Sequence, residues 1–266
     1  MEKQIPQAEA HDSTIIDQFS RQAIPFTQIP GHHDGTQLLV LFSGVSGEDS
    51  VLDVACGPGI VTCEFAWHAG TVTGVDITPA MIDAAVKRQS ELGIDNINWH
   101  LGTVTSLPYP DNSFTLVITR YSFHHLLAPV AALAEMIRVC RPGGRVLVAD
   151  VAVPSDKSKA YDRLEILRDP SHVHALTESE FDALFTQSGL QGCRRTAYGV
   201  DIELETQLRA SFPNPGDEPL IRELVTADVG ANLLGINGRM VSADDGGSKI
   251  VYTVPIAVYL GVKAEV

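Results

Sequence analysis

The chain has 266 residues, of which 44% are hydrophobic and 20% charged, so it can bury a substantial core and does not have the composition of a disordered protein. Its formal net charge is -14, and an acidic surface repels phosphate backbones, which argues against DNA or RNA as a partner. The N-terminal residues lack the apolar run of a signal peptide and no apolar segment approaches the roughly 20 residues that span a bilayer, so we expect a cytoplasmic protein without membrane insertion.

From residue 50 onward, predicted strands and helices alternate. A helical pattern at 11–43, interrupted at 29–35, precedes them. Runs rich in Val, Leu and Ile predict strands at 50–55, 71–76, 96–102, 114–120 and 145–151. The intervening segments predict helices at 60–69, 78–93 and 129–140. In the helix at 78–93, Thr78 can cap the start, Pro79 suits the first turn and Gly93 suits the end. The alternation predicts right-handed crossovers and a mostly parallel sheet, covered on both faces.

The regular alternation of predicted strands and helices ends after Val153. We expect a helix at 157–169, a polar loop, a second helix at 181–189 and a strand at 192–200. Thr177 and Glu180 form a candidate capping box before the second of these helices. Residues 249–264 predict one or two closing strands. The segment 201–245, with three prolines and several glycines between helical pieces, interrupts this strand pair, so we interpret it as an inserted cap.

The loop after the first strand indicates a nucleotide site. Gly57 and Gly59 allow a sharp turn and a close backbone approach to a ligand at the carboxyl edge of the sheet. Asp76 ends the second strand, where a carboxylate can accept both hydroxyl groups of a ribose. Asp53, just before the loop, would repel a pyrophosphate but attract a sulfonium or ammonium group. Alternatives remain, because Asp53 could instead cap loop amides and Asp76 could cap the following helix.

The same loop lacks the signatures of other nucleotide sites. A dinucleotide fingerprint needs a third glycine where Thr62 stands, and the Gly-Lys-Ser/Thr ending of a phosphate-binding loop is absent. Together with the charge of Asp53, this favours S-adenosylmethionine over NAD as the cofactor.

Four segments carry a family resemblance. Residues 51–59, 72–85, 102–126 and 136–150 resemble the successive motifs of class I S-adenosylmethionine-dependent methyltransferases, most closely the small-molecule enzymes of ubiquinone and menaquinone biosynthesis. The resemblance covers roughly residues 45–155. Residues 19–28 also resemble the helix that closes over the cofactor in that group.

The resemblance implies an α/β fold with a Rossmann-like, doubly wound, mostly parallel seven-stranded sheet, an antiparallel closing strand and an inserted helical cap. We expect one domain over residues 1–266. Its expected parts are an N-terminal helical cover (1–47), a cofactor-binding core (48–153), the C-terminal half of the sheet (154–200 and 246–266) and the substrate cap (201–245).

The resemblance also implies which residues hold the cofactor, from its methionine end to its adenine. They are Asp53, Ala55, Gly57, Gly59, Asp76, Ile77, Met81, Thr103, Val104 and Arg120. Within this set Asp76 would bind the ribose hydroxyl groups, and Met81 could equally be a core residue. Many relatives have an acid where Thr103 stands, so here a hydroxyl or the backbone would have to contact the adenine amino group.

The methyl acceptor should lie just beyond the fourth strand, where His124 and His125 occur. Methyl transfer mainly requires alignment of the nucleophile, and a proton on that nucleophile is removed by a base such as histidine near neutral pH. On a short helical turn the two rings point apart, so at most one faces the cofactor. We predict His124 as the base or substrate-orienting residue, with Tyr121, His125 and Phe26 near the substrate; alternatively, both histidines only pack.

Other candidates for the acceptor site are weaker. Loop histidines at positions 32, 33, 172 and 174 border the pocket by resemblance, although exposed loop histidines usually have no role in chemistry. Phe26, Tyr109 and Phe123 could line an aromatic acceptor site or belong to the core.

The predicted function is transfer of a methyl group from S-adenosylmethionine to an O, N or C atom of a small aromatic or apolar metabolite. The main alternative is a protein that keeps the cofactor but catalyses a non-transfer reaction such as cyclisation, or only binds. An NAD-dependent oxidoreductase and a nucleic-acid methyltransferase are further alternatives; the latter would need a basic surface.

The four cysteines form no CxxC pair, so we predict no metal site and no arsenic chemistry. The oligomeric state, including a homodimer, is left open.

Overall fold

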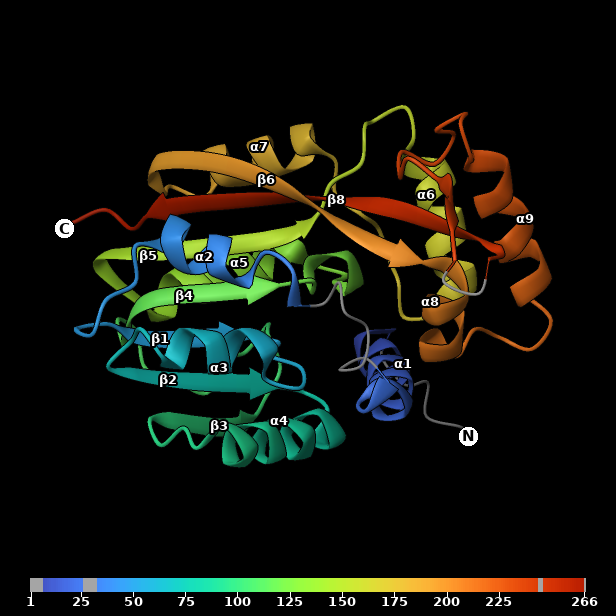
Figure 1. Cartoon of the computed structure of the whole chain (residues 1–266). Helices are drawn as coiled ribbons and strands as arrows, with labels where there is room; N and C mark the ends of the chain where they lie inside the picture. Colours follow the sequence, from blue (N-terminus) through green and yellow to red (C-terminus); the bar gives the residue numbers. More distant parts are fainter. Residues whose placement is uncertain (1–6, 26–32, 244–245, 266) are drawn as a thin grey trace, which may run out of the picture.

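The computed structural model describes residues 7–25, 33–243 and 246–265. In this part of the chain one sheet contains all the strands: β1 (Ser50–Val54), β2 (Thr71–Asp76), β3 (Ile97–Leu101), β4 (Phe114–Arg120), β5 (Cys140–Val151), β6 (Gln191–Glu203), β7 (Arg239–Ser242) and β8 (Ser248–Val262). The order across the sheet is β3-β2-β1-β4-β5-β8-β6, and β7 pairs with β8 (Figure 1). Strands β1 to β5 pair in parallel, whereas β8 is antiparallel to both β5 and β6.

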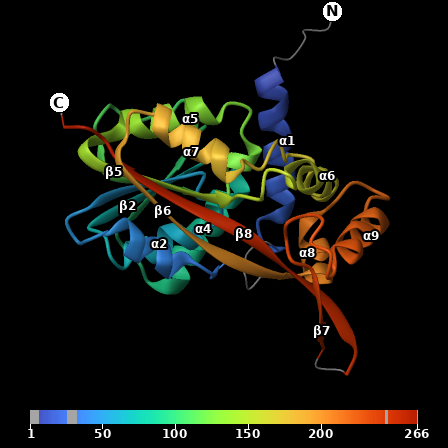
Figure 2. The same cartoon turned by 90° about the horizontal axis from the view of Figure 1, so that it is seen from above.

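The helices lie on both faces of the sheet and beyond the carboxyl ends of its parallel strands. They are α1 (Gln7–Gln22), α2 (Thr36–Ser43), α3 (Ile60–Ala66), α4 (Pro79–Leu92), α5 (Pro129–Val139), α6 (Ser158–Arg168), α7 (Glu178–Gln187), α8 (Leu204–Ser211) and α9 (Glu218–Asp228). Figure 2 shows α5 and α7 on one face and α2 and α4 on the other. Figure 1 shows α1, α6, α8 and α9 at the end of the sheet to which the arrows of the parallel strands point.

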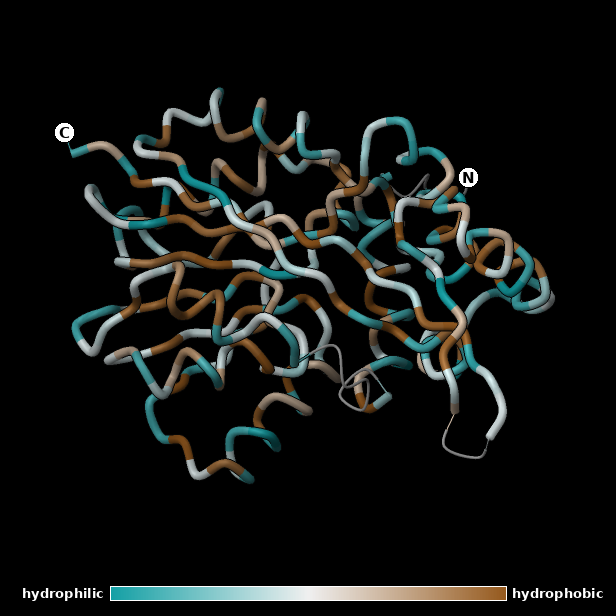
Figure 3. The backbone as a smooth tube through the Cα atoms, turned by 45° about the horizontal axis from the view of Figure 1, so that its top comes forward, coloured by the Kyte–Doolittle hydropathy of each residue, from teal (hydrophilic) through white to brown (hydrophobic). Residues whose placement is uncertain are grey.

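Side chains alternate between two buried layers along each central strand, as the strand period requires. Val51 and Ile118 face the layer that contains Phe65 of α3, whereas Leu52 and Val54 face the layer that contains α5 and α7. Figure 3 shows the resulting hydrophobic stretches along the central strands. Both faces of the sheet are therefore filled with apolar side chains, and polar chemistry is confined to the strand ends.

Most of the predicted elements are confirmed. The capping box of Thr177 and Glu180 is present at the start of α7, and Gly93 ends α4 in the left-handed conformation. Thr78 occupies the N-cap of α4 but makes no side-chain cap bond there. The segment 201–245 contains a strand, β7, between residues expected to be helical, and β8 forms one long strand. The predicted seven strands thus form the main path of the sheet, with β7 as an added edge.

The strand order reverses between β1 and β4, and ligands of open parallel sheets bind at such a reversal. The residues that leave these two strands have unusual backbones: Ala55 has φ 56° and Tyr121 has φ 57°. Non-glycine residues in the left-handed region are strained and cluster at functional sites.

The described helices include none that is long and apolar enough to cross a membrane.

A buried aspartate fixes the end of the segment between β6 and β8. Asp228 is 0% exposed, and its two carboxylate oxygens accept hydrogen bonds from the backbone N–H groups of Leu234 (2.6 Å) and Gly238 (2.8 Å). The turn from α9 into β7 therefore depends on one side chain for two of its buried donors.

Replacing Asp228 by alanine should destabilise the protein, because two buried N–H groups lose their acceptor at once. We expect Asp228→Ala to lower the free energy of unfolding by about 2–4 kcal/mol in chemical denaturation. The exposed Asp83→Ala variant on α4 is the control and should change it by about 0.5 kcal/mol or less. Equal losses in the two variants would show that the carboxylate does not hold this turn.

Candidate functional site

A cavity of about 210 Å³, here called the first cavity, lies at the reversal of strand order, between the ends of β1, β2 and β4 and helix α1. Nine of the ten residues predicted to hold the cofactor line it: Asp53, Ala55, Gly57, Asp76, Ile77, Met81, Thr103, Val104 and Arg120. Helix α1 contributes His11, Ile15 and Phe19 from the opposite side. Segments far apart in the sequence therefore form one site.

Gly59, the tenth predicted residue, does not line the first cavity. It is the N-cap of α3 with φ 75°, and a Cβ atom there would lie 2.8 Å from the Trp99 ring and 3.0 Å from Ala85. Gly59 is required for close packing of the loop on its neighbours, whereas Gly57 is the glycine that faces the cavity.

Asp76 joins the two loops that form the floor of the first cavity. One carboxylate oxygen accepts a hydrogen bond from the Gly57 N–H (2.9 Å), and the other accepts one from the Thr78 N–H (2.8 Å). The carboxylate thus caps backbone amides, and each oxygen keeps capacity for a further hydrogen bond. The Thr78 hydroxyl oxygen, close by, is buried and has no hydrogen-bond partner in the described part of the chain. This region can therefore still receive hydroxyl groups of a ligand.

Asp53 is a buried acid with little compensation. It is 1% exposed, and its carboxylate accepts a 2.6 Å hydrogen bond from the Thr62 hydroxyl. Burial raises the pKa of Asp53 to about 7, although the Thr62 hydrogen bond and the charge of Arg120 oppose this rise. Arg120 itself donates to the Asp34 carbonyl (3.1 Å) and stacks 4.5 Å from the centre of the Tyr121 ring. A positively charged ligand would stabilise the ionised form of Asp53.

A second cavity, of about 90 Å³, adjoins the first and shares Phe19, Tyr121 and His125 with it. Its remaining walls come from the end of β5, from α6 and α8, and from β6 and β8. The Tyr121 hydroxyl is hydrogen-bonded to the Tyr198 hydroxyl (2.9 Å), which fixes the ring at the boundary. The two cavities are therefore neighbours across one wall.

His124 lines the second cavity and not the first. Its Nδ1 is 2.6 Å from Oδ1 of Asp150. The same carboxylate accepts hydrogen bonds from the N–H groups of Val151 (2.7 Å, at Oδ1) and Phe123 (2.6 Å, at Oδ2). The pKa of Asp150 is lowered, so its carboxylate is ionised and can only accept a hydrogen bond. The proton between the two groups therefore sits on Nδ1 of His124, and Nε2 is the basic nitrogen. Burial lowers the pKa of His124, but the charge and hydrogen bond of Asp150 outweigh it, so the pKa is raised.

His125 differs from its neighbour in both place and charge. It lies on the wall between the cavities, and its Nδ1 is 3.1 Å from both the carbonyl and the hydroxyl oxygen of Ser171. Burial and the nearby His124 lower the pKa of His125 well below its ordinary value, so it is neutral. Its carbonyl oxygen is 2.7 Å from Nε2 of His11 on α1.

The weaker candidates occupy other positions. His172 and His174 are hydrogen-bonded to the Asp162 carboxylate (2.8 and 2.7 Å) and line neither cavity. Phe123 is buried beside Phe181, in the core. The Tyr109 hydroxyl is bonded to His100 at the surface (3.0 Å). Phe26 and His32 lie outside the described residues, and His33 lines neither cavity.

Some residues of the site were not predicted from sequence. The main one is Asp150, although it ends a hydrophobic strand in the same way as Asp53 and Asp76, and that pattern could have indicated it. Phe19 of α1 begins the segment 19–28 that the resemblance placed over the cofactor, whereas the residues contributed by α8 carry no comparable signal. The described residues contain no cluster of three or more His, Cys, Asp or Glu that could hold a metal ion.

Asp53 should make the stability of the ligand-free protein fall as pH rises from about 4 to about 7. In this window the folded protein binds more protons than the unfolded chain, whose aspartate pKa is near 3.8. The uncharged amide of Asp53→Asn does not ionise, so this variant avoids the loss of stability with rising pH. We expect it to be more stable than the parent by up to about 4 kcal/mol near pH 8. Denaturation at several pH values measures the difference, which should shrink towards pH 4; Asp83→Asn should show none. A constant difference would contradict the assignment.

The comparisons agree with the geometry. A family model described as "Methyltransferase domain" matches residues 52–148. The uncharacterized methyltransferase YcgJ of Bacillus subtilis is 30% identical over 213 residues, which cover 77% of this chain and 84% of that protein. The crystal structure of YcgJ superposes with a TM-score of 0.77 at 26% identity, covering 88% of this chain and all of the other.

A further relative is the ubiquinone/menaquinone biosynthesis C-methyltransferase UbiE of Bdellovibrio bacteriovorus. It is 40% identical over 121 residues, which span 45% of this chain and about half (51%) of that protein. Motifs, sheet topology and these similarities agree: the chain belongs to the class I S-adenosylmethionine-dependent methyltransferase family.

Proposed function

We propose that the protein transfers a methyl group from S-adenosylmethionine in the first cavity to a small acceptor in the second cavity. The observation that carries the proposal is the shared wall, because Phe19, Tyr121 and His125 border both cavities. A donor in the first cavity and an acceptor in the second would lie next to each other at these three residues. Alignment of the two can supply a large part of the rate enhancement of a displacement of this kind.

The residues of the first cavity suit the chemistry of the cofactor. Asp76 and the unpartnered Thr78 hydroxyl offer hydrogen bonds to a ribose, and Ile77 and Met81 offer apolar surface to a base. Asp53, buried and weakly compensated, suits the sulfonium or ammonium end. When bound, the cofactor supplies an electrophilic methyl group.

The second cavity suits an acceptor that is small and largely apolar. Val200 and Ile202 of β6 and Val254 and Ile256 of β8 line one side of it, and Phe19 and Tyr121 line the side next to the first cavity. The UbiE relatives are named for C-methylation in quinone biosynthesis, which is consistent with an aromatic acceptor. Helix α8 adds Gln207, Ala210 and Ser211, which supports the assignment of residues 201–245 as a substrate cap.

We infer that His124 acts as the base. Asp150 holds its Nδ1 proton, so Nε2 can take a proton from an acceptor hydroxyl, amine or activated carbon as the methyl group arrives. The neutral His125 can orient the acceptor but is too weak a base to hold its proton.

Calorimetry with S-adenosylhomocysteine and, separately, with NADH tests the cofactor assignment. Binding of the first and none of the second supports it, and the reverse result would refute it. Production of S-adenosylhomocysteine from S-adenosylmethionine with a panel of small aromatic hydroxy compounds then separates methyl transfer from a non-transfer reaction.

Binding of S-adenosylmethionine should release a proton from Asp53 near neutral pH. The cationic ligand favours the carboxylate, so calorimetry below about pH 7 should show binding heats that depend on the ionisation enthalpy of the buffer. Asp53→Asn should abolish this dependence and weaken binding by about 10- to 100-fold. Asp83→Asn, exposed and outside both cavities, is the control and should retain both properties. Buffer-independent heats in the parent protein would contradict the role of Asp53.

Methyl transfer should require the neutral form of His124, so kcat should fall as pH decreases through its raised pKa. We expect His124→Ala to lower kcat by about 10²- to 10⁴-fold and to remove this acid limb. Asp150→Asn removes the charge that raises the pKa, so the limb should move to lower pH while kcat also drops. His68→Ala, on the surface, serves as the control. Full turnover with an unchanged pH profile in His124→Ala would exclude it as the base.

A further inference from the structure

The second cavity contains a buried amide that lacks a hydrogen bond. Gln207 lines the cavity from α8 and is 6% exposed, and its side-chain oxygen Oε1 has no hydrogen-bond partner in the described part of the chain. Native proteins satisfy most buried polar atoms, so an exception inside a cavity marks a place where a ligand group can donate, directly or by displacing a water.

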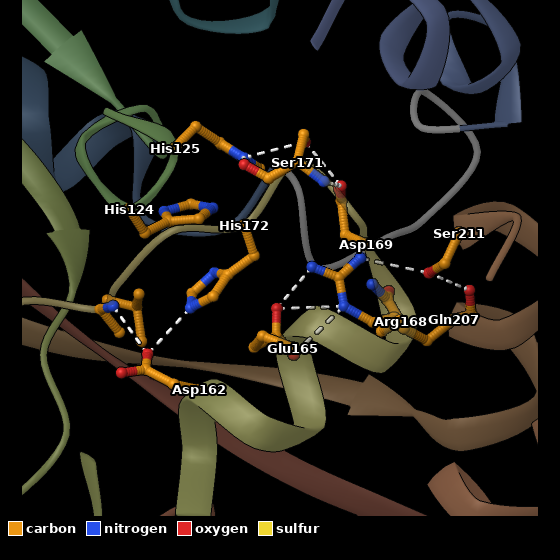
Figure 4. Close-up of polar contacts among 12 residues, drawn as sticks. His124, His125, Asp162, Glu165, Arg168, Asp169, Ser171, His172, Gln207 and Ser211 are labelled. Atoms are coloured by element: carbon orange, nitrogen blue, oxygen red, sulfur yellow. Dashed lines mark hydrogen bonds and ion pairs between the residues drawn. The ribbon is translucent and has the colours of Figure 1, made fainter. Parts of the chain in front are cut away.

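The polar groups beside Gln207 are already engaged. Arg168 donates through Nε to Glu165 (3.0 Å) and through a terminal nitrogen to the Ser211 hydroxyl (3.2 Å), as Figure 4 shows. The Ser211 hydroxyl in turn donates to the backbone carbonyl of Gln207 (2.6 Å). None of these groups donates a hydrogen bond to the side-chain oxygen of Gln207. That oxygen is therefore available to a ligand at the end of the cavity lined by α8.

The charges around the cavity disfavour an anion. Asp150, Glu165 and Asp169 contribute three carboxyl groups, and Arg168, which is held by Glu165, is the one lysine or arginine among the described lining residues. Arg168 keeps the pKa of Glu165 low despite burial, and His124 does the same for Asp150, so both acids are ionised. An anionic acceptor would therefore meet an excess of negative charge, because the three carboxyl groups outnumber the one arginine.

We propose that the methyl acceptor is an uncharged molecule of about one ring that carries a hydroxyl or N–H donor, and that this donor binds Oε1 of Gln207 at the end of the cavity lined by the cap. The size follows from the volume of about 90 Å³, because one water-sized group needs roughly 10–15 Å³ by the same measure. The reacting end then faces Tyr121 and His125. This inference rests on the proposed function, since it treats the second cavity as the acceptor site.

Three matched probes test the inference: para-fluorophenol has the donor, para-fluoroanisole has lost it, and para-fluorobenzoate is an anion. Their dissociation constants are measured by fluorine NMR titration of the full chain with S-adenosylhomocysteine present. In the parent protein we expect the phenol to bind about tenfold or more tightly than the anisole, because an unmet buried acceptor penalises the ether. The benzoate should bind no better than the anisole.

Gln207→Leu locates the donor contact. It should reduce the preference for phenol over anisole to about twofold or less, while the exposed Gln187→Leu variant on α7 keeps the parent ratio. An unchanged ratio in Gln207→Leu, tightest binding of the benzoate, or no binding of any probe to the parent would each overturn the inference. Gln207→Glu, which keeps an acceptor oxygen, should bind the phenol more tightly than Gln207→Leu does. Failure of S-adenosylhomocysteine to bind would instead contradict the proposed function, so the two claims fail separately.

Discussion

A parallel sheet buried on both faces leaves its strand ends for polar groups, and three aspartates lie at its carboxyl edge. Asp53, Asp76 and Asp150 come from β1, β2 and β5, and each is at most 8% exposed. Buried carboxyl groups need compensation, and the kind of compensation decides what each one can do. The chemistry of the site follows from how differently these three acids are satisfied.

Asp76 is satisfied by two backbone N–H groups and so acts as a fixed, partly open acceptor. Asp150 receives two backbone N–H groups and His124, and these hold its pKa low despite burial. Asp53 has the Thr62 hydroxyl and the more distant Arg120, which leave its pKa near 7. Asp76 thus suits hydroxyl groups, Asp150 orients His124, and Asp53 gains most from an incoming cation.

The two adjacent histidines show how strongly local packing determines chemistry. They share the short 3-10 helix Phe123–His125, yet His124 contacts a carboxylate while His125 contacts Ser171. The pKa of His124 is raised and that of His125 is lowered, so a base and a neutral polar group lie next to each other. The sequence analysis expected the two rings to point apart, but their centroids lie only 4.1 Å apart at an interplanar angle of 45°. What distinguishes them is the partner of each ring, which comes from elsewhere in the chain.

This distinction explains how much of the site was predictable. Asp53 and Asp76 lie at the ends of hydrophobic strands and the loop glycines follow within a few residues, so local patterns locate them. Gln207 and Arg168 carry no such pattern, because their position in the second cavity depends on packing of the cap against α6. Gly57 and Gly59 lie in one motif, yet only the three-dimensional structure shows that Gly57 faces the cavity and Gly59 faces Trp99.

Helix α1 connects what the sequence analysis treated as separate parts. Gln18 and Gln22 donate to the Ser211 carbonyl at the end of α8 (2.5 and 3.1 Å), and His11 contacts the His125 carbonyl. The helix that covers the first cavity is therefore hydrogen-bonded to the segment that closes the second. Since Phe19 borders both cavities, a shift of α1 would change both binding sites at once. Helices α1 and α8 are thus linked beside the residues that the two cavities share.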